Sequence, residues 1–239
     1  MTAQPQPDEQ ENVIEMLQEA FKLRQPIQLI NTFRGVPVES EATIAMISQN
    51  FVAVNTTGMQ TTCVALEKRT YLKSNTLAGT YRAIPIAIDI PNLGVILTKF
   101  VRVGASFGKR VELRVQPREP LRIKIHRASR TITGTIADLS PSGVGAFLFG
   151  ATTEDDIQLP RADMVDIELP LPGLAHPLLL NGHVMNIHPN LESGVQRLGF
   201  RIRPGNEDRL AISEYISERK DEIMVELEAL YEQMRTEPA

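Results

Sequence analysis

The stretch RVELRVQPREPLRIKIHRASRTITGTIADLSPSG, residues 110–143, decides the fold of the second half of the chain. Apolar and polar residues alternate from Leu121 to His126, which is typical of a strand with one buried face. Ile132 and Ile136 continue the pattern in a second strand that runs up to Asp138. We therefore expect a pair of half-buried strands here, followed by a turn.

Further short apolar segments follow this pair, and each is bounded by Pro, Gly or Asn. Such punctuation separates strands in all-β domains. The predicted strands are Val144–Phe149, Met164–Leu169, Leu178–Ile187 and Val195–Arg203.

The first half of the chain gives a second set of short strands after a helix. Helical spacing of apolar residues predicts a helix from Asn12 to Arg24, which Pro26 ends. Segments rich in Ile, Val and Thr then predict a small β-barrel or sandwich, and Cys63 is expected in the core of one strand. These strands are Ile27–Ile30, Ala42–Ile47, Phe51–Val54, Cys63–Leu66, Ala83–Ile90 and Gly94–Val103.

The last segment has apolar residues at intervals of three, four or seven from Ile212 to Met234, which predicts one helix of roughly 25 residues. We expect it to pack on the second barrel. The alternative is a short dimerising coiled coil, and therefore a homodimer. The predicted fold class is mainly β, with two small β-barrel domains in tandem, residues 1–108 and 109–239, an N-terminal helix and a long C-terminal helix.

Composition excludes several classes of protein. The chain has 239 residues with a net charge of −4 and a single cysteine, Cys63. No intramolecular disulfide or thiolate metal cage can form, which fits a cytoplasmic protein. No apolar run approaches the ~20 residues of a membrane helix, and the acidic N-terminus is not a signal peptide.

Charge is unevenly distributed along the sequence. Residues 101–130 carry nine Lys or Arg and two Glu, hence +7, whereas residues 206–239 carry ten Asp or Glu and four Lys or Arg, hence −6. A concentrated basic block in an acidic protein favours a localised anion site. It does not favour a general nucleic-acid binder, which is more often basic overall.

Two motifs carry the chemistry, Arg110-Val-Glu-Leu-Arg114 and Asp138-Leu-Ser140-Pro-Ser-Gly143. Each alone is weak, because surface arginines and Asx turns are common. The two motifs occur in this order, one strand pair separates them, and the run Leu198–Ile202 follows. Together these features resemble the PilZ domain, the bacterial receptor module for cyclic di-GMP. The preceding helix and β-domain are similar in size and placement to the N-terminal domain of YcgR-like flagellar brake proteins.

The resemblance implies a ligand and roles for these residues. Cyclic di-GMP has two phosphates and two guanines, and a guanidinium matches a phosphate or the O6 and N7 edge of guanine. Arg110 and Arg114 are expected on phosphate and guanine edges, Asp138 and Ser140 on guanine, and Gly143 at the turn. Lys109, where many members have Arg, and Arg197 are candidate auxiliary residues.

Catalysis has little support in the sequence, so we expect a non-enzymatic receptor without a metal. His176, His183 and His188 lie within 13 residues, but the odd spacing of the last two predicts opposite faces of a strand. No Walker, Gly-x-Gly-x-x-Gly or Gly-x-Ser-x-Gly motif is present.

The resemblance also implies a mode of action. Ligand binding at the junction is expected to change the orientation of the two domains and to regulate a protein partner, which the resemblance implies to be components of the flagellar motor at the basal body. The alternatives are a cyclic di-GMP-responsive DNA-binding or transcription regulator, a regulator of exopolysaccharide or biofilm output, and an adaptor that has lost binding.

Overall fold

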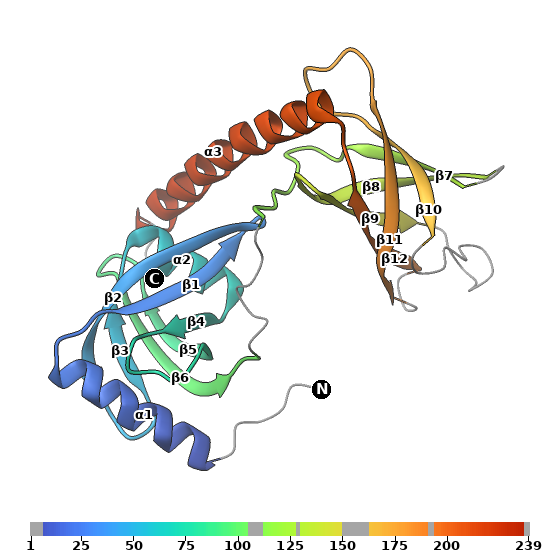
Figure 1. Cartoon of the computed structure of the whole chain (residues 1–239). Helices are drawn as coiled ribbons and strands as arrows, with labels where there is room; N and C mark the ends of the chain where they lie inside the picture. Colours follow the sequence, from blue (N-terminus) through green and yellow to red (C-terminus); the bar gives the residue numbers. More distant parts are fainter. Residues whose placement is uncertain (1–6, 105–111, 128–129, 150–162, 191–193, 237–239) are drawn as a thin grey trace. The chain divides into compact units, whose positions relative to one another are not determined.

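The computed structural model describes residues 7–104, 112–127, 130–149, 163–190 and 194–236 (Figure 1). They form two compact units. The first unit comprises residues 1–111 together with 223–239, and the second comprises residues 112–222. This division differs from the predicted boundary at 108/109 chiefly in the C-terminal helix, whose last part belongs to the first unit.

The first unit contains a closed barrel of six antiparallel strands in the order β1-β2-β3-β6-β5-β4. Closure leaves no strand edge exposed to other chains. The strands are β1 (Ile27–Phe33), β2 (Val36–Ile47), β3 (Val52–Asn55), β4 (Thr70–Lys73), β5 (Tyr81–Asp89) and β6 (Gly94–Arg102).

Helix α1 (Pro7–Lys22) packs against this barrel through one face. Val13, Leu17 and Ala20 recur at the spacing of helix turns and are buried in the same apolar cluster as Ile27 and Leu29. The predicted helix at 12–24 is therefore confirmed, and it begins earlier, at Pro7.

The strand predicted at Cys63–Leu66 is wrong, because these residues lie in helix α2 (Gly58–Glu67). The Thr57 side chain caps the helix by accepting a hydrogen bond from the Gln60 N–H. Gln60 to Ala65 are all buried, so the sequence shows no alternation between apolar and polar faces. Cys63 is in the core as expected, and burial raises the pKa of its thiol to about 12.

The second unit contains another closed antiparallel barrel, in the order β10-β11-β12-β9-β8-β7. Its strands are β7 (Arg122–Arg127), β8 (Arg130–Ser140), β9 (Gly143–Phe149), β10 (Met164–Leu169), β11 (Leu178–Asn190) and β12 (Val195–Ile202). The segment that alternates from Leu121 to His126 corresponds to β7, in which Ile123 and Ile125 are fully buried. The predicted mainly β fold of two barrels is confirmed.

Helix α3 (Asn206–Thr236) contributes residues to both units. Ile212 and Ile216 are buried in the second unit, as predicted. Leu227, however, is buried with Val38 and Cys63 in the first unit. The expectation that the whole helix packs on the second barrel is therefore wrong for its C-terminal part.

We predict that Leu227→Ala destabilises the protein by about 2–5 kcal/mol, because it leaves a cavity in a fully buried cluster. The matched control is Val225→Ala on the same helix, at a side chain that is 66% exposed, with an effect of about 0.5 kcal/mol or less. Urea unfolding followed by circular dichroism measures both. Equal losses for the two variants would contradict this packing of α3.

Candidate functional site

The candidate site lies on the outer face of the second barrel, at the end of β8. Leu139 is fully buried in the barrel, so its neighbours Asp138 and Ser140 point to the other face of the sheet. A β-bulge between Ile136 and Asp138 precedes them. Bulges often re-aim a side chain beside a binding site.

Asp138 is held between two arginines from distant parts of the sequence. Arg114 donates from Nη1 to Oδ1 at 3.2 Å, and Arg197 donates from Nη2 to Oδ2. The carboxylate is nearly buried, with 9% of its side chain exposed, whereas the side chains of Arg114 and Arg197 are 41% and 51% exposed. The site thus presents two half-exposed guanidinium groups fixed on one carboxylate.

The segment that carries Arg114 is attached to β8 and to helix α3 directly after that residue. Val115 and Leu139 exchange both backbone hydrogen bonds at 2.9 Å. The buried Arg219 of α3 donates from Nε to the carbonyl of Gln116 at 2.9 Å. These contacts fix the backbone that presents Arg114 to Asp138.

The turn between β8 and β9 is held by the acidic residue of the arginine motif. The Glu112 carboxylate accepts hydrogen bonds from the backbone N–H of Ser142 at 3.2 Å and from its hydroxyl at 2.5 Å. Ser140 is buried, and its hydroxyl donates to the carbonyl of Gly143 at 3.3 Å. Ser142 therefore presents the exposed hydroxyl of the turn, and Ser140 stabilises the turn from inside.

Glycines form the floor of the site beside Asp138. Asp138 pairs with Gly145 on β9, Gly145 pairs with Gly199 on β12, and Gly199 pairs with Asn186 on β11. A Cβ at Gly145 would stand 2.8 Å from Oδ2 of Asp138. The Asp138 carboxylate therefore covers the buried Gly145, and the partly exposed Gly199 is where a flat ring can lie close to the sheet.

Gly143 has a different role from the one expected of it. Its φ is not positive, so the turn does not need the freedom of a glycine there. A Cβ at this position would stand 3.2 Å from both the Phe200 carbonyl oxygen and the Ser140 hydroxyl. The constraint at Gly143 is close packing of β12 and Ser140 around it.

An aromatic side chain flanks the row of glycines. Phe147, on the outer face of β9, pairs with Arg197 on β12. The guanidinium carbon of Arg197 lies 5.9 Å from the centre of the Phe147 ring, which is a cation–π distance. Phe147 thus helps to orient the arginine that holds Asp138.

The structure brings together most of the residues that the sequence singled out. Arg114, Asp138, Ser140, Gly143 and Arg197 lie in one site, whereas Lys109 and Arg110 lie outside the described residues. Sequence reasoning missed five members of the site. The missed residues are Glu112, Ser142, Gly145, Phe147 and Gly199.

A signal for one of the missed residues, Gly199, was present in the sequence. Leu198 and Phe200 are buried, so alternation along β12 places Gly199 on the same outer face as Arg197. The pairing of β12 with β9 then selects Gly145, and this pairing is not written in any local pattern.

The histidines of β11 are placed differently from the prediction. A bulge between Val184 and Asn186 shifts the register of β11, so His183 and His188 pair with Arg201 and Arg197 on one outer face. The prediction of opposite faces is therefore wrong. Among the described residues, no group of three or more His, Cys, Asp or Glu side chains is placed to hold a metal ion.

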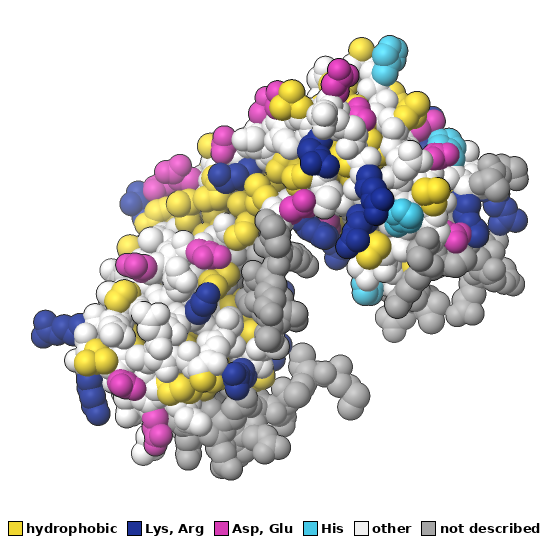
Figure 2. Space-filling view, viewed as in Figure 1, with side chains coloured by type: hydrophobic (Ala, Val, Ile, Leu, Met, Phe, Trp, Pro, Cys, Tyr) yellow, Lys and Arg dark blue, Asp and Glu magenta, His cyan; other side chains and the backbone are white. Residues whose placement is uncertain are grey.

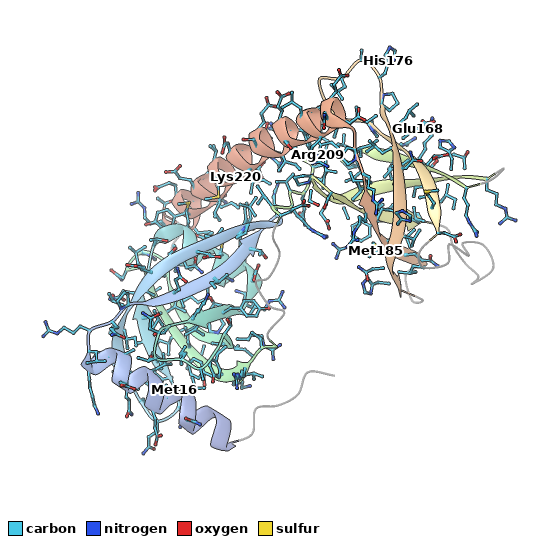
Figure 3. The ribbon with its side chains drawn as sticks, in the orientation of Figure 1. Met16, Glu168, His176, Met185, Arg209 and Lys220 are labelled. Carbon is cyan, nitrogen blue, oxygen red and sulfur yellow. The ribbon has the colours of Figure 1, made fainter. Side chains whose placement is uncertain are left out.

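A separate charged cluster lies on other strands of the same barrel. Glu168 of β10, labelled in Figure 3, accepts from Lys124 at 2.8 Å and contacts His126 at 2.9 Å. Hydrogen bonds from Lys124 and then His126 lower the pKa of Glu168. Figure 2 shows further Lys and Arg side chains gathered beside histidines on the visible face of this barrel.

Comparison with known proteins identifies the family of the second barrel. The family model described as "PilZ domain" matches residues 108–218, which confirms the resemblance carried by the two motifs. An uncharacterised protein of Aquifex aeolicus (strain VF5) is 28% identical over 222 residues, with 88% of this chain and 94% of that protein covered.

Two solved structures are similar over most of the chain. One is Escherichia coli YcgR in complex with c-di-GMP, at 13% identity and a TM-score of 0.42, covering 94% of this chain and 95% of that one. The other is the Bacillus subtilis inhibitor of motility MotI/DgrA, at 13% identity and a TM-score of 0.41, covering 82% of this chain and 96% of that one.

Among the described residues, no helix has the length and apolar character needed to cross a membrane.

We predict that Gly145→Ala disrupts the site, because the added methyl group must push the Asp138 carboxylate away from Arg197. The expected cost is about 1–3 kcal/mol of folding free energy, as for other overpacked positions. Gly199→Ala is the control, since the nearest atom would lie at an ordinary 3.6 Å. Urea unfolding that shows equal stability for both variants would refute the close contact.

Proposed function

We propose that this protein is a non-enzymatic receptor for cyclic di-GMP and that the ligand binds on the outer face of the second barrel. The observation that carries the proposal is the carboxylate of Asp138, held by Arg114 and Arg197 beside Gly145 and the partly exposed Gly199. The match of residues 108–218 to the PilZ domain supports it independently.

The site has the groups that a guanine nucleotide requires. The Asp138 carboxylate has more acceptor positions than its two arginine contacts use, so it can accept from N1–H and N2–H of a guanine. Arg114 and Arg197 are more than two-fifths exposed, and their remaining N–H groups can reach a phosphate or a guanine edge. Gly199, which is partly exposed and has no side chain, leaves room for the flat base beside the carboxylate.

These groups suit binding and not a chemical step. In the described residues of the site, the Ser142 hydroxyl contacts Glu112 and the Ser140 hydroxyl contacts a backbone carbonyl. Neither hydroxyl meets a histidine, so the site lacks the usual pairing of a nucleophile with a neutral base. Arginine side chains serve to bind anions and do not act as general acids or bases at neutral pH.

We predict that the intact protein binds cyclic di-GMP and does not bind GMP or GTP with comparable affinity. Arg114→Ala abolishes binding with little loss of stability, because its side chain is 41% exposed. Arg110→Ala has the same effect, because Arg110 is the other arginine of the motif Arg110-Val-Glu-Leu-Arg114. Asp138→Ala weakens binding by about 1–3 kcal/mol, the loss of a buried polar partner.

Calorimetric titration measures each of these affinities, and Arg130→Ala is the control, an exposed arginine at the far end of β8. A wild-type affinity for Arg114→Ala removes the arginine from the site. Absence of binding by the wild-type chain refutes the receptor function.

We further propose that the ligand changes the orientation of the two units, as expected if Arg110 and Arg114 act at the boundary between them. Helix α3, which belongs to both units, is a second connection that such a change would involve. X-ray scattering from the full chain with and without cyclic di-GMP would detect it, and superimposable profiles would contradict it.

The output that we propose is control of flagellar motility through a protein partner, because the order of the two domains is similar to that of YcgR-like brake proteins. In the bacterium that encodes this chain, raised cyclic di-GMP then slows swimming with the wild-type gene and not with Arg114→Ala. A change in transcription or in exopolysaccharide without a change in swimming would favour the alternative regulators.

A further inference from the structure

Arg201 on β12 lies on the same outer face as the site but has no assigned role. Leu198, Phe200 and Ile202 are buried in the barrel, so Arg197, Gly199 and Arg201 face outward. Arg197 already contacts Asp138. At about 3.3 Å per residue, Arg201 begins roughly 13 Å further along the strand, with Gly199 between the two arginines.

The pairing of the strands places Arg201 directly beside the Asp-x-Ser-x-x-Gly turn. Arg201 pairs with Gly143, and Gly143 pairs with Ser140. The Ile202 N–H donates to the carbonyl of Ser142 at 2.9 Å, which fixes β12 against the turn. Because Gly143 has no side chain, β9 places no side chain beside Arg201 at that position.

Arg201 also differs from the other two arginines in its partners. Arg114 and Arg197 share the carboxylate of Asp138. Arg201 is exposed, and no carboxylate within the described parts of the chain pairs with it. An arginine without an acidic partner can bind an anion at a lower free-energy cost than a paired arginine, because no existing ion pair must be broken.

The charge of the described part of the site points in the same direction. The charges of Arg114 and Arg197 are offset by those of Asp138 and Glu112. Arg201 is an additional positive charge beside this set, and positive charge attracts a ligand with two phosphates.

We propose that Arg201 is a further ligand-binding residue, which contacts a phosphate of the nucleotide on the side of the glycine row opposite Arg197. The proposal rests on the proposed function, since it assigns a contact within the same site. Asp138 and Arg197 then receive the guanine end of the ligand, and Arg201 receives the charged backbone that extends across Gly199 toward the turn.

The test is calorimetric titration of the full chain with cyclic di-GMP at low and high salt, using R201Q, R201K and R130Q. R201Q weakens binding about 10-fold or more, the usual worth of a hydrogen bond between charged groups. R201K retains part of the affinity as a point charge. R130Q, the control at the far end of the same barrel, changes the dissociation constant by about 2-fold or less.

Salt dependence separates a direct contact from a structural effect. If Arg201 contacts a phosphate, R201Q flattens the dependence of affinity on salt, and R130Q leaves it unchanged. If R201Q binds as tightly as R130Q while Arg114→Ala fails to bind, the receptor stands and the role of Arg201 is refuted. If the wild-type chain does not bind, both proposals fail.

Discussion

The site depends on one shared carboxylate. Asp138 receives Arg114 from the segment before β7 and Arg197 from β12, residues that are 83 positions apart in the sequence. Without this acceptor, two cations on neighbouring segments would repel each other and turn into solvent. Burial of the carboxylate against Gly145 makes the contact specific, because a charge with little access to water must keep its partners. The arginines are thereby fixed before any ligand arrives, which reduces the entropy that binding would cost.

The closed barrel supplies this arrangement through alternation and register. Inward residues of β8, β9 and β12 fill the core, and every second residue is left for the outer face. The bulge before Asp138 and the row of Gly145 and Gly199 then set which outward residues meet. The site is therefore built mainly on paired strands, with Arg114 and Glu112 supplied by the segment before β7 and Ser142 by the turn after β8. That segment is itself tied to β8 at Val115 and to α3 through Arg219.

Local patterns in the sequence predicted much of this and failed where the determining contact is distant. Alternation predicted β7 and β8, and short apolar runs bounded by Pro, Gly or Asn predicted β9 to β12. The two motifs gave Arg114, Asp138 and Gly143. The helix at Cys63 was missed because a run buried on all sides has no period, and the capping by Thr57 is a weak signal. The bulge that brings His183 and His188 to one face depends on pairing with β12. The role of Glu112 depends on a turn 30 residues away.

The most direct test is a crystal structure of the full chain with cyclic di-GMP. Our account predicts a guanine lying over Gly145 and Gly199, with its N1–H and N2–H groups on the Asp138 carboxylate and a phosphate within reach of Arg114. A ligand bound elsewhere, with Arg114, Arg197 and Asp138 still paired only to one another, would contradict the account.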